Sequence, residues 1–174
     1  MDILKVFIRK MEYKDVDEVM EIESSVYPEH HWSREGFINE INSDLGNYFS
    51  LIIEDKVVGY GGFWAILDEG HITTIAIHKD FQGKGLSEIL LQQFFETGYV
   101  KKLKWFTLEV RISNIKAIKL YEKYKFKSCG VRNKYYQDNQ EDALIMWTPE
   151  IEEISFSENY QKLKEKTAKK IEIL

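Results

Sequence analysis

Apolar residues recur along this chain with two different periods, and segments of one period alternate with segments of the other. Alternating or β-rich runs predict strands over residues 5–10, 48–53, 57–65 and 70–77. Between the first two of these strands, apolar residues at helical spacing predict two helices, one capped by Asp15 and the other by Ser33. The first half of the chain therefore predicts a strand, two helices and three further strands.

The second half of the chain opens with a polar loop, residues 79–85, that contains Gly83 and Gly85. Helical periodicity then predicts helices over residues 86–99 and 114–124, and β-rich runs predict strands over 105–110, 131–136 and 143–147. Strands that alternate with helices in this way predict the α+β (mixed α/β) class, a mixed sheet with helices on its faces. The segment 149–174 is rich in Glu and Lys, and we expect it to be partly helical.

Length and composition indicate one packed domain. The chain has 174 residues, 44% of them hydrophobic, and only two prolines, which fits a folded globular protein and excludes a low-complexity or disordered one. The single cysteine, Cys129, excludes an internal disulfide framework and a cysteine-cluster zinc site. A reducing compartment is the expected setting for such a chain.

Charge and hydropathy narrow the range of partners. The net charge of −5 opposes direct nucleic-acid binding and favours a cationic partner. No apolar run approaches the roughly 20 residues that span a bilayer, and the N-terminus lacks the features of a signal peptide. We therefore expect no membrane partner and a cytoplasmic or organellar-stromal location.

The loop over residues 79–85 is a candidate anion site because it joins a predicted strand to the start of a predicted helix. Unpaired backbone N–H groups and the helix dipole favour phosphate at such a place. Gly83 and Gly85 allow a tight turn and close approach of a ligand, and Lys84 adds a charge. The alternative is an ordinary strand-to-helix turn, and the spacing matches neither a P-loop nor Gly-x-Gly-x-x-Gly.

A second group of polar residues follows the next predicted strand. Glu109 lies within the β-rich run, Asn114 begins the helix after it, and Tyr121 lies two turns further on. A carboxylate, an amide and a phenol could thus meet near the glycine loop. The alternative is that Glu109 is an outward-facing strand residue paired with Arg111, and that Tyr121 is a core aromatic residue.

Residues 82–87 (QGKGLS) and 108–114 (LEVRISN), with Leu120-Tyr121-Glu122, resemble the GNAT superfamily of acetyl-coenzyme A dependent N-acetyltransferases. Within it, the chain resembles the RimI-type ribosomal-protein alanine N-acetyltransferases. This closer resemblance adds Asp68-Glu69, Tyr135-Tyr136 and residues 141–146 (EDALIM), and it covers the chain from about Val6 to Trp147. It implies one GNAT domain over residues 1–148, followed by a charged extension over 149–174.

The resemblance also implies a fold, a co-substrate and site residues. The fold is a mostly antiparallel twisted sheet of about seven strands flanked by about four helices. Acetyl-CoA is the implied co-substrate, without a metal, and Glu109 is the implied base and Tyr121 the implied acid. The residues implied to hold acetyl-CoA are Ile75, Ala76, Ile77, Gly83, Lys84, Gly85, Leu86, Ser87, Glu88 and Asn114.

The implied reaction is transfer of acetyl to a protein N-terminus, the N-terminal alanine of small-subunit ribosomal protein eighteen. Other N-termini, lysine side chains and small amines are alternative acceptors, and a non-catalytic acyl-CoA-binding module is a further alternative. The chain departs from the family pattern at Ser87, which replaces Gly or Ala, and in residues 29–31, which separate Pro28 from Trp32. Because that loop borders the peptide site in the family, its change bears on the choice of substrate.

Other chemistries have weaker signals. Cys129 has no histidine nearby in the sequence, which argues against a nucleophilic role. The pair His30-His31 and the single residues His71 and His78 show no metal-ligand spacing. We therefore expect these residues to be ordinary surface or core residues.

Overall fold

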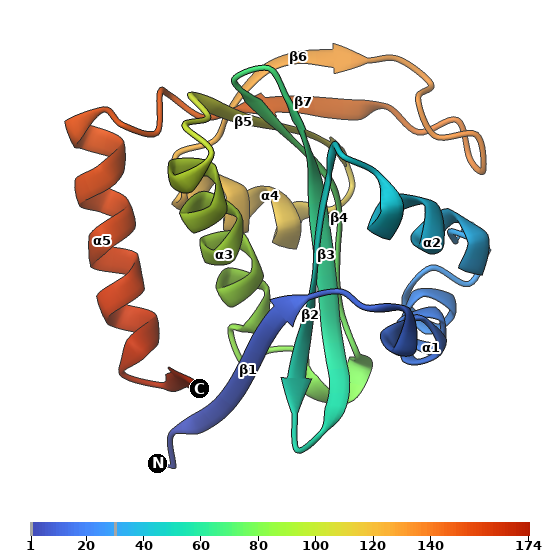
Figure 1. Cartoon of the computed structure of the whole chain (residues 1–174). Helices are drawn as coiled ribbons and strands as arrows, with labels where there is room; N and C mark the ends of the chain where they lie inside the picture. The colour runs from blue at the N-terminus through green and yellow to red at the C-terminus, as the bar shows by residue number, and fades with distance from the viewer. Residues whose placement is uncertain (1, 30) are drawn as a thin grey trace.

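The protein, described by a computed structural model over residues 2–29 and 31–174, consists of one sheet with helices on both faces (Figure 1). The strands are β1 (Leu4–Lys10), β2 (Gly46–Ile53), β3 (Lys56–Ile66), β4 (Glu69–Ile77), β5 (Trp105–Arg111), β6 (Lys127–Arg132), β7 (Ala143–Trp147) and β8 (Ile171–Ile173). The α-helices are α1 (Val16–Val26), α2 (Arg34–Asn42), α3 (Leu86–Val100), α4 (Ile115–Lys123) and α5 (Ile154–Ala168). Short 3-10 helices cover Tyr13–Asp15 and Lys79–Phe81.

The strands are ordered β6-β7-β5-β4-β3-β2-β1-β8 across the sheet. Pairing is antiparallel except between β4 and β5 and between β1 and β8. The expected mixed, mostly antiparallel sheet is therefore confirmed. The eighth strand and the fifth helix both come from the segment after residue 148.

Two apolar cores lie on the two faces of the sheet. On one face α3 packs with α4 and α5, and aromatic rings such as Phe94, Phe95 and Phe106 are fully buried there. On the other face α1 and α2 pack around Phe37 and Tyr60. Figure 1 shows α1 and α2 on one side of the strands and α3, α4 and α5 on the other. Helices α1, α2 and α3 thus bury their apolar sides against the sheet, and α5 packs on α3.

The central parallel pair, β4 and β5, is joined over only three residues of each strand. Glu69, Gly70 and His71 pair with residues 105–107, and beyond them the two strands separate. A register shift opposite Gly62 and Phe63 leaves Thr73 as an extra residue in β4, and such a bulge bends its strand. The sheet is therefore open between the later halves of β4 and β5.

Two local predictions are wrong. Asp15 occupies the N-cap position of α1, but its side chain makes no cap hydrogen bond, because its carboxylate instead accepts from Arg9, from the Glu12 amide and from Ser50. The strand expected over 131–136 is β6, at Lys127–Arg132. The chain leaves the sheet after Arg132 because Lys134 adopts a positive φ of 50° and its amide donates to Asp142.

Ser33, by contrast, caps α2 as expected, since its hydroxyl accepts from the Gly36 amide at 3.0 Å. The segment after residue 148 forms α5, so the partly helical expectation is confirmed, while β8 was not foreseen. No helix within residues 2–29 and 31–174 has the length and apolar character needed to cross a membrane.

Candidate functional site

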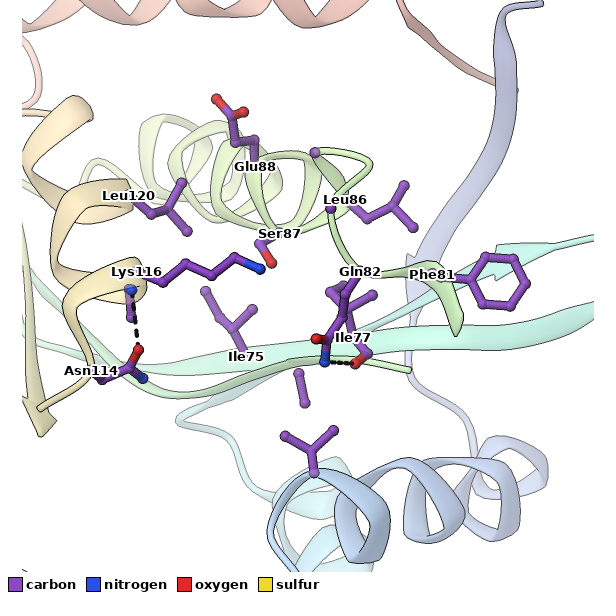
Figure 2. A pocket seen from close by; sticks show the side chains of 15 residues that line it. Ile75, Ile77, Phe81, Gln82, Leu86, Ser87, Glu88, Asn114, Lys116 and Leu120 are labelled. Carbon is purple, nitrogen blue, oxygen red and sulfur yellow. Dashed lines mark hydrogen bonds between the residues drawn. The ribbon is translucent and has the colours of Figure 1, made fainter. Parts of the chain in front are cut away.

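A cavity of about 310 Å³ lies where β4 and β5 separate, beside the glycine loop and the start of α3. We call it the glycine-loop cavity, and Figure 2 shows its lining side chains. Nine of the ten residues expected to hold acetyl-CoA line it, namely Ile75, Ala76, Ile77, Gly83, Gly85, Leu86, Ser87, Glu88 and Asn114. The tenth, Lys84, lines a neighbouring cavity instead.

The glycine loop presents backbone donors to this cavity. Gly83 and Gly85 have φ values of +79° and +84°, a conformation that is costly for residues with a Cβ. Within the described residues, no acceptor is found for the backbone N–H groups of 83–87. Free N–H groups together with the N-terminal dipole of α3 form a site suited to a phosphate.

The end of β4 supplies further peptide groups to the same cavity. The His78 amide donates to Val58 on β3 at 2.8 Å, so alternation along an antiparallel strand turns the peptide groups of Ile75 and Ile77 toward the open side. The Ile77 carbonyl accepts from Gln82 Nε2 at 3.0 Å, as Figure 2 shows. The Ile75 carbonyl accepts from the Tyr27 hydroxyl at 3.2 Å.

Asn114, which caps α4, and Lys116, in the first turn of α4, line the glycine-loop cavity on the side opposite β4. Asn114 caps α4, its Oδ1 accepting from the Ala117 amide at 3.2 Å. Lys116, which the sequence analysis did not single out, extends from α4 toward Ser87 (Figure 2). Its place two residues after Asn114, in the first turn of α4, is the signal that could have identified it.

A second cavity, of about 280 Å³, is lined by several titratable side chains from α1, β5 and the loop that contains Tyr136. We call it the carboxylate cavity. Its polar lining includes Glu23, Glu109, Arg111 and Tyr136, and it shares Asn114 with the glycine-loop cavity. The two cavities therefore meet at the gap between β4 and β5.

Glu109 lies on β5 and is partly exposed in the carboxylate cavity. Its Oε1 accepts from Arg132 Nε at 3.2 Å. The alternative pairing with Arg111 is wrong, because the Arg111 guanidinium contacts Asp138 at 2.8 Å and Glu141 at 3.5 Å. Glu109 thus keeps one oxygen, Oε2, without a hydrogen bond from the described residues.

Tyr136 lines the carboxylate cavity, and Tyr121 lies near two of the tyrosines that line it. The Tyr136 ring stacks under Arg111, with the guanidinium carbon 3.9 Å from the ring centroid, and burial raises its pKa to about 12. Tyr121 is 9% exposed, with its ring against Phe126. Burial raises the pKa of Tyr121 and the nearby phenols of Tyr27 and Tyr136 add to the effect, so Tyr121 stays protonated. Tyr121 lines neither cavity.

Glu23, on α1, is a buried carboxylate that was not among the site residues predicted from the sequence. It is 2% exposed, and its Oε1 accepts from the Trp32 amide at 3.0 Å. Its Oε2 has no partner among the described residues. Burial raises its pKa. A charged residue in the apolar half of α1, nine residues before Trp32, was the available signal.

The remaining candidates show no site chemistry in the described residues. Cys129 is an exposed free thiol on β6. His71 pairs with Glu69 at 2.8 Å, and the His78 side chain accepts from the Asp80 amide, while His30 lies outside the described residues. Within residues 2–29 and 31–174, no three His, Cys, Asp or Glu side chains are grouped as a metal site.

Comparison with known proteins places this geometry in a family. The sequence matches the Acetyltransferase (GNAT) family over residues 16–126. It is 38% identical over 144 residues to a Bacillus subtilis (strain 168) protein provisionally named ribosomal protein bS18-alanine N-acetyltransferase. That alignment covers 82% of this chain and 95% of the relative. It is 33% identical over 120 residues to the Escherichia coli (strain K12) ribosomal protein bS18-alanine N-acetyltransferase, covering 68% and 80%.

Solved structures agree with the sequence matches. The crystal structure of the ribosomal-protein-S18-alanine N-acetyltransferase from Escherichia coli has a TM-score of 0.75 at 30% identity, covering 83% of this chain and 93% of that one. The PaiA N-acetyltransferase from Thermoplasma acidophilum, solved with coenzyme A, shares the fold with a TM-score of 0.69 at 18% identity, covering 83% and 98%. The chain belongs to the GNAT family of acetyltransferases, and it is an acyltransferase.

Proposed function

We propose that this protein transfers the acetyl group of acetyl-CoA to the α-amino group of a protein N-terminus, and that its substrate is the N-terminal alanine of ribosomal protein bS18. The observation that carries the proposal is the pair of cavities that meet at the β4–β5 gap. Among the described residues, one presents backbone N–H groups without an acceptor and the other a carboxylate oxygen without a donor. The similarity to relatives named for bS18-alanine acetylation supports the choice of acceptor.

The glycine-loop cavity fits acetyl-CoA. The N–H groups of residues 83–87 would bind the pyrophosphate, and the apolar side chains of Ile75 and Leu120 would border the pantetheine arm. The backbone N–H groups of Ile75 and Ile77 on the open side of β4 would donate to the carbonyl oxygen of the thioester. Acetyl-CoA supplies the activated acyl group, so the chain itself needs no nucleophile.

The carboxylate cavity fits the amine that accepts the acetyl group. An α-amino group has a pKa near 8 and is mostly protonated at neutral pH, so it must lose a proton before it can attack. Glu109, whose Oε2 accepts no hydrogen bond from the described part of the chain, would accept that proton directly or through a water molecule. The second carboxyl group, Glu23, lines the same cavity, and its Oε2, which has no partner among the described residues, would accept a hydrogen bond from the N-terminus.

Tyr121 would complete the proton transfer. The departing thiolate of CoA has a conjugate-acid pKa near 8.5, so a phenol can protonate it when the two are close. Because burial raises the pKa of Tyr121, the phenol retains its proton over the working pH range. Glu109 and Tyr121 thus act on opposite ends of the reaction, one on the amine and the other on the sulfur.

The experiment that tests this proposal measures acetyl-CoA-dependent thiol release with a panel of peptides. One peptide begins with Ala-Arg, others differ only in their first residue, and N-terminally blocked lysine peptides and polyamines serve as controls. Selective turnover of the alanine peptide is the expected result. Turnover of lysine or polyamine alone would replace the proposed acceptor, and CoA binding without turnover would indicate a binding module.

A further inference from the structure

A third cavity, of about 600 Å³, lies on the other side of the glycine loop. We call it the lysine cavity. It shares Gly83, Gly85 and Glu88 with the glycine-loop cavity. Its other walls are the start of β1, the end of α4 and the end of the segment 149–174. The proposed pyrophosphate site is therefore the point at which the two cavities meet.

Positive charge dominates the lysine cavity although the protein as a whole is acidic. Two acids line it, Asp2 and Glu88, against four lysines, Lys84, Lys123, Lys166 and Lys170. Lys123 is neutralised by Glu88, whose Oε1 lies 2.8 Å from its Nζ. Among the described residues, no carboxylate forms an ion pair with the other three lysines. Such a cavity favours an anion of high charge.

A buried chain of hydrogen bonds holds the last turn of α5 beside the glycine loop. Thr167 on α5 accepts from Gln92 Nε2 at 3.0 Å, and the same Gln92 nitrogen donates to the Tyr124 hydroxyl at 2.9 Å. Tyr124 in turn donates to Glu88 at 2.8 Å. Because each member is partnered, the chain ties α5 to the first turns of α3.

Apolar contacts and strand pairing hold the residues after α5. Strand β8 pairs with β1, and Ile171 is 4% exposed. Ile171 Cδ1 lies 3.7 Å from the position that a Cβ on Gly85 would occupy, so the end of the chain packs directly on the glycine loop. Lys166 and Lys170 are consequently held at fixed places on one wall of the cavity.

We propose that the lysine cavity binds a phosphorylated nucleoside, the 3′-phosphoadenosine end of the CoA proposed above, with Lys166 and Lys170 as ligands of its 3′-phosphate. This inference rests on the proposed function. In CoA the pyrophosphate and the 3′-phosphate are joined through a single ribose, and the two cavities share three residues of the glycine loop and α3. The dianionic phosphomonoester matches the unpaired lysines, and the volume suits a nucleoside. Residues 149–174, beyond the matched segment 16–126, thereby gain a role in binding.

The test compares the binding of CoA and 3′-dephospho-CoA by calorimetry. The chains are the wild type, the double variant Lys166→Gln/Lys170→Gln, and the control Lys162→Gln/Lys169→Gln, which removes the same charge from exposed sites outside the cavity. We expect the wild type to prefer CoA about tenfold, since an exposed lysine–phosphate pair contributes about two- to fivefold. The preference should nearly disappear in Lys166→Gln/Lys170→Gln and persist in the control.

The other outcomes separate this inference from the proposed function. Equal binding of the two compounds by the wild type, or an unchanged preference in Lys166→Gln/Lys170→Gln, would overturn the lysine cavity as the phosphate site while leaving acetylation intact. Failure of the wild type to bind either compound would overturn both. Melting temperatures measured without ligand show whether the two double variants are equally folded.

Discussion

The glycine-loop cavity and the carboxylate cavity lie side by side at the β4–β5 gap, yet different kinds of chemical group line them. The first offers backbone N–H groups, apolar side chains and the N-terminal start of α3. The second offers ionisable side chains, two carboxylates and an Arg111 guanidinium stacked on Tyr136. Among the described residues, only Asn114 lines both.

This difference suggests a division of labour between binding and chemistry. Backbone groups have no pKa in the working range, so the glycine-loop cavity can bind a phosphate anion unchanged across pH. Proton transfer requires side chains that titrate, and these are gathered around the acceptor. Substitutions in the glycine-loop cavity should therefore change the KM for acetyl-CoA and leave kcat almost unaffected. Substitutions in the carboxylate cavity should change kcat and leave the affinity for CoA almost unaffected.

The largest expected effect is that of Glu109→Gln. The amide cannot accept the amine proton, so kcat should fall about 10²- to 10⁴-fold, while the affinity for CoA stays within about twofold. Steady-state kinetics and calorimetry on the same preparation measure the two quantities. Glu122→Gln, on the exposed side of α4, is the matched control and should behave as the wild type. Unchanged turnover in Glu109→Gln would remove Glu109 as the base.

A smaller effect is expected for Tyr121→Phe, which removes the hydroxyl and keeps the ring against Phe126. Without the proton donor, kcat should fall about ten- to hundredfold. Acyl donors whose thiols have a lower pKa need less protonation, so they should restore much of the lost rate.

Tyr135→Phe is the control for this change, because Tyr135 is an exposed residue outside both cavities. An equal loss of rate with every acyl donor would mean that Tyr121 supports packing rather than protonation of the thiolate.

Gly85→Ala tests the other side of the comparison. At φ +84° an alanine costs about 1 to 2 kcal/mol, and relaxation of the loop would turn its N–H groups away from the phosphate. We expect the KM for acetyl-CoA to rise about fivefold while kcat stays within about twofold. Gly130→Ala, on β6 and without positive φ, should change neither constant. A fall in kcat alone would break the proposed division of labour.

The sequence predicts those parts of the fold that depend on residues close together in the chain. The Ser33 cap and the limits of β7 follow from neighbouring residues, and both are found where expected. Asp15 shows the opposite case. Its cap motif is present, but Arg9 on β1 and Ser50 on β2, far apart in the chain, compete for the same carboxylate. Likewise β8 could not be predicted from its own three residues, because it forms by pairing with β1 at the other end of the chain.

The site divides in the same way. The strand–glycine–helix pattern is contiguous, so nine of the ten expected lining residues do surround one cavity. The carboxylate cavity joins α1, β4, β5 and the loop containing Tyr136, and no spacing in the sequence shows that Glu23 belongs with Glu109. The tenth residue, Lys84, lines a third cavity instead, and one wall of that cavity is the end of the chain, which folds back on the loop.

The smallest predicted effect compares two buried carboxylates at the two ends of α1. Burial alone would raise the pKa of Asp15, but hydrogen bonds from Arg9, Glu12 and Ser50 outweigh it and the pKa is lowered. Glu23 has one hydrogen bond, from the Trp32 amide, and burial raises its pKa. The stabilising contribution of Asp15 is thus present above its unfolded pKa and lost as pH falls. That of Glu23 is present below its unfolded pKa and lost as pH rises.

Glu23→Gln isolates this term, since glutamine Oε1 can still accept from the Trp32 amide but cannot ionise. We would measure stability by urea unfolding between about pH 3 and pH 8. The stability of Glu23→Gln relative to the wild type should increase with pH above the ordinary glutamate pKa of 4.5, whereas that of Asp15→Asn should decrease with pH only around and below the ordinary aspartate pKa of 3.8. Parallel stability curves for Glu23→Gln and the wild type would show that Glu23 is not held against ionisation. Glu23→Ala also loses the hydrogen bond to Trp32, and we expect a higher KM for the peptide with an unchanged affinity for CoA. These two results together would mean that Glu23 serves to position the loop that contains Trp32 at the acceptor site, and not to stabilise α1.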